Sequence, residues 1–302
     1  MKRKLISFDW AMKKLLRSKA NFDILEGFLS ELLKEDIQIL DILESESNKE
    51  NLQDKHNQVD LKVKNHKNEI IIIEIQYERE FDYFQRIMFG TSKVITEHLD
   101  ESDPYAKVIR VISINILYFD LGRGEDYIYH GSTNFQGLHK KDILTLLAGQ
   151  QKIYNTDKIY KIFPEYYLIK VNSFNDVAKN TLDEWIYFLK NEEIKKDFKA
   201  KGLKKAVQKM HVLKLSDQDR AAYEDYQERR HYQVSMFESS YVVGQMEGRE
   251  EGIEKGRKEG KKEGIIEIAL NCLNAGLLDR ETIAQMTGLT VQELEALSVN
   301  KG

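Results

Sequence analysis

Two carboxylates stand at matching places in a short segment that is rich in β-branched residues. Residues 59–76 read VDLKVKNHKNEIIIIEIQ, with Asp60 near the beginning and Glu74 directly after four consecutive isoleucines. Gln76 follows two residues later. Apolar runs on both sides of a polar stretch predict a β-hairpin with its turn at 65–69. The hairpin therefore holds the set of side chains in this chain best suited to catalysis.

The expected register of the hairpin brings the two acids together. If Lys64 pairs with Ile70, Asp60 lies directly opposite Glu74, with Cβ atoms about 5 Å apart. Side chains alternate along a strand, so the other face is expected to belong to the core. That face is apolar throughout and consists of Leu61, Val63, Ile71, Ile73 and Ile75.

Strand alternation adds two polar groups to the face that carries the acids. Gln76 shares the face of Glu74, and Lys62 shares the face of Asp60. Facing carboxylates repel each other unless a cation or a proton separates them. Such oxygen ligands suit Mg²⁺ or Mn²⁺, and a metal held there can activate water against a phosphodiester. The alternative is a pair of solvated acids that neutralise Lys62, and the spacing alone fits both interpretations equally.

The elements around the hairpin predict an α/β fold. Apolar residues with helical spacing occupy 8–33 before it and 81–99 after it, and a further apolar strand begins at Lys107. The order helix, three strands, helix, strand favours an α/β sandwich over residues 1–175. From Thr181 onward the pattern is helical.

The last third of the chain has a different composition. A helical extension at 176–243 leads into 244–264, where glycine recurs at every fourth position among charged residues. Each glycine costs a helix about 1 kcal/mol relative to alanine, so we expect a marginal helix or a linker there, with self-association less favoured. Residues 265–302 resemble a helix-turn-helix in size. The second helix of this unit carries Glu293 and Glu295, which predicts partner binding or dimerisation over direct DNA reading.

Charge along the chain is uneven although its net value is only −4. Any nucleic-acid surface must therefore be local. Residues 1–20 carry seven Lys or Arg against one Asp, and residues 190–214 carry nine Lys against three acids. These counts alone favour solvated helix faces for both stretches.

The cysteine count and the hydropathy exclude several classes of protein. A lone Cys272 excludes a disulfide framework and a cysteine-rich zinc site. No apolar run is long enough for a membrane span, and the N-terminal residues lack the pattern of a signal peptide. We expect a cytoplasmic protein with no membrane partner.

Four features of the chain together resemble one known family. FDWAMKKLL resembles the opening helix of that family, VDLKV and EIQ its two active-site strands, TLDEWIYFLK a helix beyond its core, and the repeated EG its tail. The family is the recombination-promoting nucleases, also called PD-(D/E)XK transposase-like proteins. The resemblance covers nearly the whole chain. It implies a restriction-endonuclease-like three-layer α/β/α core with a helical C-terminal extension.

The resemblance also implies Mg²⁺-dependent cleavage of double-stranded DNA, with Asp60 and Glu74 as metal ligands. Gln76 then stands where the superfamily has lysine. Glutamine can orient the attacking water, but it supplies no positive charge to the phosphate or the nucleophile. Three residues are candidates for that charge: Lys62, Lys13 and Arg86.

A third acid is usual on the first helix of such folds. We expect Glu26 to be this third metal ligand because it lies in the middle of the predicted helix, with Glu31 as the alternative. The competing interpretation is a solvated helix residue in either case.

Two functional hypotheses follow. The first is a metal-dependent DNA endonuclease that acts in recombination or in the transposition of mobile elements. The second is a weak or inactive descendant of such enzymes, which works as an oligomeric DNA- or protein-binding module through its C-terminal tail.

Overall fold

A computed structural model of the chain describes residues 5–14, 16–43, 60–211 and 215–299. It divides into two compact units, residues 1–231 and 232–302. The unit boundary falls inside helix α7 (Asp217–Ala275).

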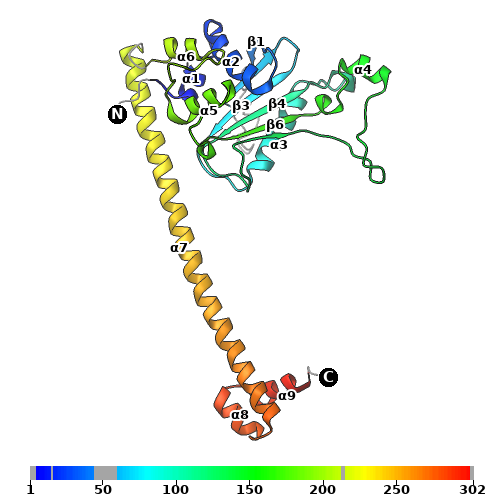
Figure 1. The fold of residues 1–302 in the computed structure, drawn as a ribbon, viewed down its shortest axis with the longest axis vertical. Helices are drawn as coiled ribbons and strands as arrows, with labels where there is room; N and C mark the ends of the chain where they lie inside the picture. Colours follow the sequence, from blue (N-terminus) through cyan, green and yellow to red (C-terminus); the bar gives the residue numbers. More distant parts are fainter. Residues whose placement is uncertain (1–4, 15, 44–59, 212–214, 300–302) are drawn as a thin grey trace. The chain divides into compact units, whose positions relative to one another are not determined.

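A mixed sheet forms the middle of the first unit. Its strands, within the described residues, are β1 (Ile39–Leu43), β2 (Leu61–Asn65), β3 (Ile70–Gln76), β4 (Val111–Leu117), β5 (Ile128–Gly131) and β6 (Glu165–Lys170). They lie in the order β1-β2-β3-β4-β6-β5 (Figure 1). The three central strands β3, β4 and β6 are parallel, and the remaining pairs are antiparallel.

The hairpin of β2 and β3 has the predicted register. Lys64 pairs with Ile70, and Leu61 pairs with Ile73. Because β4 pairs with β3 in parallel, Asn115 stands beside Glu74. Tight register is expected here, since a slip of one residue would turn the apolar face of each strand toward the wrong layer.

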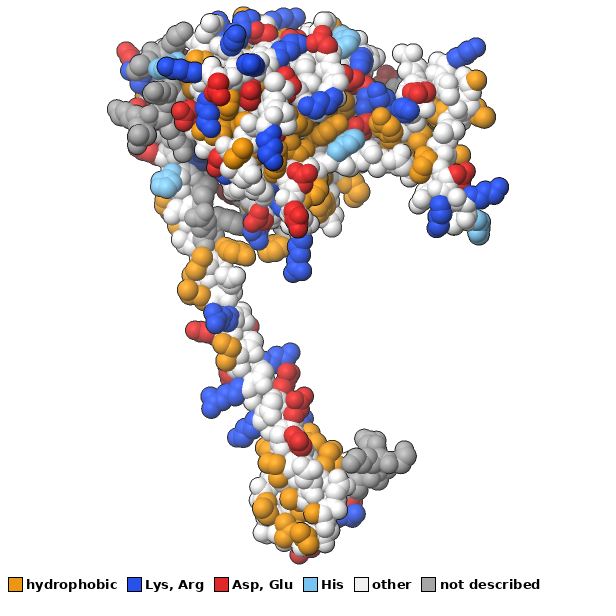
Figure 2. All heavy atoms as spheres, viewed as in Figure 1, with side chains coloured by type: hydrophobic (Ala, Val, Ile, Leu, Met, Phe, Trp, Pro, Cys, Tyr) orange, Lys and Arg blue, Asp and Glu red, His pale blue; other side chains and the backbone are white. Residues whose placement is uncertain are grey.

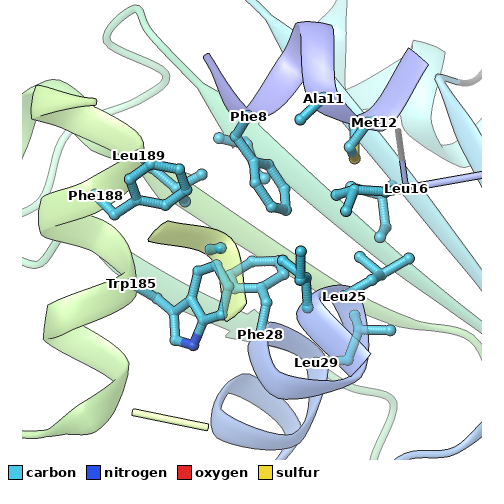
Figure 3. Close-up of a cluster of buried hydrophobic side chains, with 14 of the residues drawn as sticks. Phe8, Ala11, Met12, Leu16, Leu25, Phe28, Leu29, Trp185, Phe188 and Leu189 are labelled. Atoms are coloured by element: carbon cyan, nitrogen blue, oxygen red, sulfur yellow. The ribbon is translucent and has the colours of Figure 1, made fainter. Parts of the chain in front are cut away.

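One face of the sheet packs on a large hydrophobic core, as predicted. The five apolar hairpin residues are buried there with side chains from four helices. These helices are α1 (Phe8–Lys14), α2 (Phe22–Leu33), α5 (Thr181–Asn191) and α6 (Leu203–Lys209). Figure 3 shows Phe8, Phe28 and Trp185 directed toward one another, and the ring centroid of Phe8 lies 5.6 Å from that of Phe28 and 6.1 Å from that of Trp185. This packing joins part of the predicted extension to the predicted core.

Helix α3 (Tyr83–Glu97) covers the other face of the sheet. Val94 packs against Ile70 and Ile72, while Tyr83 and Ile87 pack against the end of β4. The arrangement is the three-layer α/β/α core that the sequence predicted, with helices above and below the sheet (Figure 1).

The single helix predicted over 8–33 is wrong, because the structure breaks it into α1 and α2. Residues Arg17–Asn21 offer no large apolar side chain, Ser18 is extended, and a short 3-10 turn (Lys19–Asn21) precedes Phe22. This break places Arg17 in a loop and leaves the apolar residues of both helices free to face the same core.

The second unit contains most of α7 together with α8 (Arg280–Thr287) and α9 (Val291–Val299). Ala269, Ile283 and Leu294 form its small core. The glycine-rich segment 244–264 lies within α7.

Helix α4 (Ala148–Tyr154) belongs to the first unit. Among the described helices, none combines the length and the apolar character that a membrane span needs.

Candidate active site

Asp60 and Glu74 meet at one end of the β2–β3 hairpin. Asp60 directly precedes β2, and its Oδ2 accepts a hydrogen bond of 2.7 Å from the backbone N–H of Ile75. That bond ties the Asp60 carboxylate to the strand that carries Glu74. The two carboxylates are close enough for the charge of Asp60 to raise the pKa of Glu74. The structure thus brings the two predicted metal ligands together.

Arg86 joins this pair from the first turn of α3. Its Nη2 donates to Glu74 Oε1, and its Nη1 donates to Glu80 Oε1. Gln76 Nε2 also donates to Glu80 Oε1, at 2.8 Å. The result is a continuous polar network from Gln76 through Glu80 and Arg86 to Glu74. We call Asp60, Glu74, Gln76, Glu80 and Arg86 the acid cluster.

Burial is the main influence on the Glu74 carboxyl. The pKa of Glu74 is raised to about 7, because burial and, to a lesser degree, the charges of Asp60 and Glu80 together outweigh the opposing effect of Arg86. The ion pair with Arg86 therefore compensates only part of the cost of burying this charge. The raised pKa means that a proton and a bound cation would compete for the Glu74 carboxylate near neutral pH.

Arg86 stays charged in this setting. Burial by itself lowers the pKa of Arg86, but the charges of Glu74 and Glu80 outweigh burial and raise it. Arginine carries its charge at every physiological pH and offers several donors in a fixed plane, which suits contact with phosphate oxygens.

A buried tyrosine fixes the position of Arg86. Tyr83 is fully buried one turn earlier in α3, and its hydroxyl donates to Asn115 Oδ1 at 3.1 Å. Asn115 in turn donates to Ser113 Oγ at 3.0 Å. These contacts pin the start of α3 to β4 beside Glu74. Arg86 consequently reaches the cluster from a rigid element.

Lys62 shares the predicted face but points toward the other end of α3. Its Nζ lies 3.3 Å from Glu97 Oε2, and the lysine is buried. Glu97 follows Arg86 by eleven positions, which is about 16 Å along a helix. Lys62 is thus engaged away from Arg86. Lys13 belongs to α1, and its side chain lies outside the described part of the structure.

Neither candidate third acid reaches the acid cluster. Glu26 Oε1 accepts from the backbone N–H of Ile39 at 2.8 Å, at the beginning of β1, which pairs with the far end of β2. Glu31 Oε2 accepts from Thr181 Oγ1 at 2.5 Å. Both acids satisfy polar groups of neighbouring segments. The structure therefore does not bring Glu26, the third metal ligand predicted from the sequence, to Asp60 and Glu74.

The donor set suits a hard divalent cation in its chemistry. Asp60, Glu74 and Glu80 offer carboxylate oxygens, the ligands that Mg²⁺ and Mn²⁺ prefer. Within the described ranges, the side chains form no preassembled group of three His, Cys, Asp or Glu around one point. Two ligands from the hairpin, completed by substrate and water oxygens, would match the usual way in which Mg²⁺ is held.

The acid cluster is partly open to solvent and lies outside the cavity of about 1200 Å³ found in this unit. That cavity is at the opposite end of β3, where Lys64, Glu69 and Arg110 line it. A partly exposed cluster at a sheet end is accessible to a large polymer.

Sequence reasoning missed one member of the cluster, Glu80. It lies four residues after Gln76, in the connection between β3 and α3. A charged residue between the end of a buried strand and a helix is a usable signal, because loops at strand ends often carry functional groups.

Two family models match the sequence. PD-(D/E)XK nuclease family transposase matches residues 6–240, and Rpn/YhgA-like nuclease family, C-terminal HTH domain, matches residues 262–299. No curated protein and no solved structure gave a match. The first match spans the sheet, its covering helices and the acid cluster. The second spans the end of α7 with α8 and α9.

Proposed function

Because the chain belongs to the PD-(D/E)XK nuclease family transposases, we propose that it is a Mg²⁺- or Mn²⁺-dependent endonuclease of double-stranded DNA. The observation that supports this most is the meeting of Asp60 and Glu74 on neighbouring strands, beside a charged arginine. We assign the activity to DNA recombination or the movement of mobile elements, in the cytoplasm.

Asp60 and Glu74 would hold the metal through their carboxylates. A bound divalent ion would supply a Lewis acid for the phosphodiester and lower the pKa of a coordinated water. Glu74 would hold a cation as the deprotonated carboxylate, since a proton and a cation compete for the same oxygens. The backbone N–H of Ile75 holds Asp60 in place throughout.

Arg86 is our choice for the positive charge that Gln76 lacks. Gln76 donates a hydrogen bond to Glu80, and Glu80 together with Glu74 holds the Arg86 guanidinium beside the predicted metal ligands. A fixed cation that meets developing negative charge on a phosphate stabilises the transition state without reorganisation. Of the three candidate cations, Arg86 contacts a predicted metal ligand, whereas Lys62 pairs with Glu97.

A second function rests on the C-terminal unit. The match to an HTH domain hints at DNA binding, but Glu293 and Glu295 of α9 oppose phosphate contact electrostatically. Met246, Ile253 and Ile268 are exposed large apolar residues of α7. We therefore propose that this tail joins copies of the chain into a homo-oligomer. Light scattering on a variant lacking residues 244–302 should show fewer subunits per particle than the parent. An unchanged number of subunits would contradict this assignment.

The nuclease proposal is tested by plasmid nicking and linearisation with Mg²⁺ or Mn²⁺, against EDTA. Glu74→Ala and Asp60→Asn should abolish cutting. Asp36→Asn is the matched control, because Asp36 is an exposed carboxylate that pairs with Lys201 on the surface. Equal cutting by the parent and by both cluster variants would overturn the proposal.

A further inference from the structure

Exposed cations from two distant parts of the chain lie on adjoining segments, and one of them, Arg17, contacts Asp60. Lys14, Arg17 and Lys19 follow from α1 into the turn before α2, and Lys205 and Lys209 lie on α6. All five side chains are exposed. We call these five residues the basic face. Figure 2 shows Lys and Arg side chains, with acids among them, over the part of the molecule where Figure 1 labels α2 and α6.

Several contacts join the two stretches. The N–H of Ile6 donates to the carbonyl of Met210 at 2.9 Å, and Leu5 bridges His211, so the end of α6 is tied to the residues before α1. Lys205 pairs with Asp23 in the first turn of α2. That turn directly follows Lys19. Two stretches that appear as separate basic segments in the sequence thus form one surface.

The basic face reaches the acid cluster through Arg17. Arg17 Nη2 donates to the backbone carbonyl of Asp60 at 3.1 Å. The guanidinium is exposed and keeps further donors for another partner. An anion bound by Arg17 would consequently lie next to the predicted metal ligands.

Within the part of the chain that the structure describes, most cations of this face have no carboxylate partner. Lys205 has Asp23, but Lys14, Arg17, Lys19 and Lys209 make no ion pair with any described residue. Some cations elsewhere in the first unit do have carboxylate partners, as Lys62 has Glu97 and Lys67 has Glu35. A local surplus of positive charge on a protein of net charge −4 favours a polyanionic partner.

We propose that the basic face binds the phosphate backbone of double-stranded DNA and leads one strand to the acid cluster. This rests on the proposed function for the identity of the substrate, but it concerns binding and is measurable without cleavage. Phosphate contacts set the position of a duplex and carry no sequence information. The face therefore serves every DNA sequence alike.

The test measures how DNA binding depends on salt concentration. Binding of a labelled duplex is monitored by fluorescence anisotropy in Ca²⁺ without Mg²⁺. A variant with Lys14→Gln, Lys19→Gln and Lys209→Gln, three exposed cations of the face, is compared with the parent. Each phosphate contact contributes about 0.9 to the slope of log affinity against log salt, so the slope should fall by about 3 and affinity roughly tenfold or more.

A matched control removes the same charge elsewhere in the unit. Lys140, Lys141 and Lys152 are exposed lysines in the segment between β5 and β6. Their triple exchange to Gln should leave the slope nearly unchanged. Thermal unfolding followed by circular dichroism verifies that both triple variants are folded, since all six side chains are exposed.

Three outcomes would overturn the proposal. One is an unchanged salt slope in the basic-face variant, and another is an equal loss in the control. The third is normal DNA binding with lost self-association, which would assign the face to an acidic protein surface. Failure of the nuclease proposal is separate, because it shows as cutting that does not need Glu74, whatever the basic face does to binding.

Discussion

Strand β3 has an arginine-bridged pair of carboxylates at each end, and the two pairs differ in a way that separates scaffold from site. At its beginning, Arg110 bridges Glu69 and Glu165. At its end, Arg86 bridges Glu74 and Glu80. The first bridge links the hairpin turn to the starts of β4 and β6. The second links β3 to α3.

The two bridges differ in exposure. The side chains of Arg110, Glu69 and Glu165 are 13%, 12% and 4% exposed. Those of Arg86 and Glu80 are 28% and 29% exposed, while Glu74 is 8% exposed. The second bridge is therefore the more exposed of the two, although Glu69 and Arg110 of the first line the cavity at the opposite end of β3.

The two bridges also differ in charge balance. Each acid at the Arg110 end has a further partner, since Asn65 Nδ2 donates to Glu69 at 2.7 Å and His130 Nε2 lies 2.8 Å from Glu165. At the Arg86 end three carboxylates meet, those of Asp60, Glu74 and Glu80, and the charges of Asp60 and Glu80 help to raise the pKa of Glu74. This gathering of carboxylate oxygens is what we associate with metal binding.

Removing the Glu74 carboxylate should have the largest effect on activity. Glu74→Gln is expected to lower the single-turnover rate of DNA cleavage on the order of 10³-fold or more, because losing a metal removes several kcal/mol of transition-state stabilisation. The melting temperature should not fall, because the buried charge is removed as well. A rate within tenfold of the parent would contradict the assignment.

A Glu→Gln exchange at the Arg110 end of β3 should lower stability and leave the cleavage rate unchanged. Glu165→Gln leaves Arg110 buried with one carboxylate fewer, and breaking such a pair costs about 3–5 kcal/mol. Urea unfolding should report this loss, while cleavage per folded molecule stays unchanged. If Glu165→Gln abolished cleavage in fully folded protein, the division into scaffold and site would fail.

The raised pKa of Glu74 predicts a pH-dependent cost in the metal-free protein. The folded-state pKa of about 7 exceeds the ordinary value of 4.5, so the folded state binds more protons than the unfolded state between these values. Protonation of Glu74 therefore contributes to the free energy of unfolding fully below pH 4.5, and this contribution is lost as the pH rises through about 7. The change in the free energy of unfolding amounts to about 3 kcal/mol. Urea unfolding of the parent and of Glu74→Gln across this range should diverge in this way, and parallel curves would argue against a buried, protonated Glu74.

Exchanging Arg86 should have a smaller effect than exchanging Glu74. Arg86→Gln should slow cleavage by roughly 10²-fold, the magnitude seen when one preorganised donor is lost. Arg86→Lys should restore part of the rate because it returns the charge without the planar fork. A Lys62→Gln variant is the matched control and should cut normally. The reverse ranking would assign the positive charge to Lys62.

The hairpin was predictable from sequence because its register depends on local pattern. The alternation of Leu61, Val63, Ile71 and Ile73 permits one pairing that buries every apolar side chain, and that pairing sets Asp60 by Glu74. Arg86 was one of three candidates for the cation. Choosing among them requires the rotation of α3, which is set by Tyr83 and its long-range contact with Asn115.

Features that depend on contacts between distant segments were not predictable in this way. Glu26 has the expected place in the sequence, but the packing of α2 directs it to Ile39. The break after α1 and the contact from Arg17 to Asp60 likewise depend on tertiary packing. Periodicity reports which face of an element is buried and says nothing about its partner.

The most direct test of the contrast between the two ends is Mn²⁺ binding, measured by electron paramagnetic resonance of the free ion. The parent protein and Glu165→Gln should bind Mn²⁺ alike, whereas Asp60→Asn and Glu74→Gln should lose at least 10–100-fold in affinity, the minimum expected when a ligand and not merely its supporting group is removed. Unchanged binding by Asp60→Asn and Glu74→Gln, or loss of binding in folded Glu165→Gln, would contradict the account.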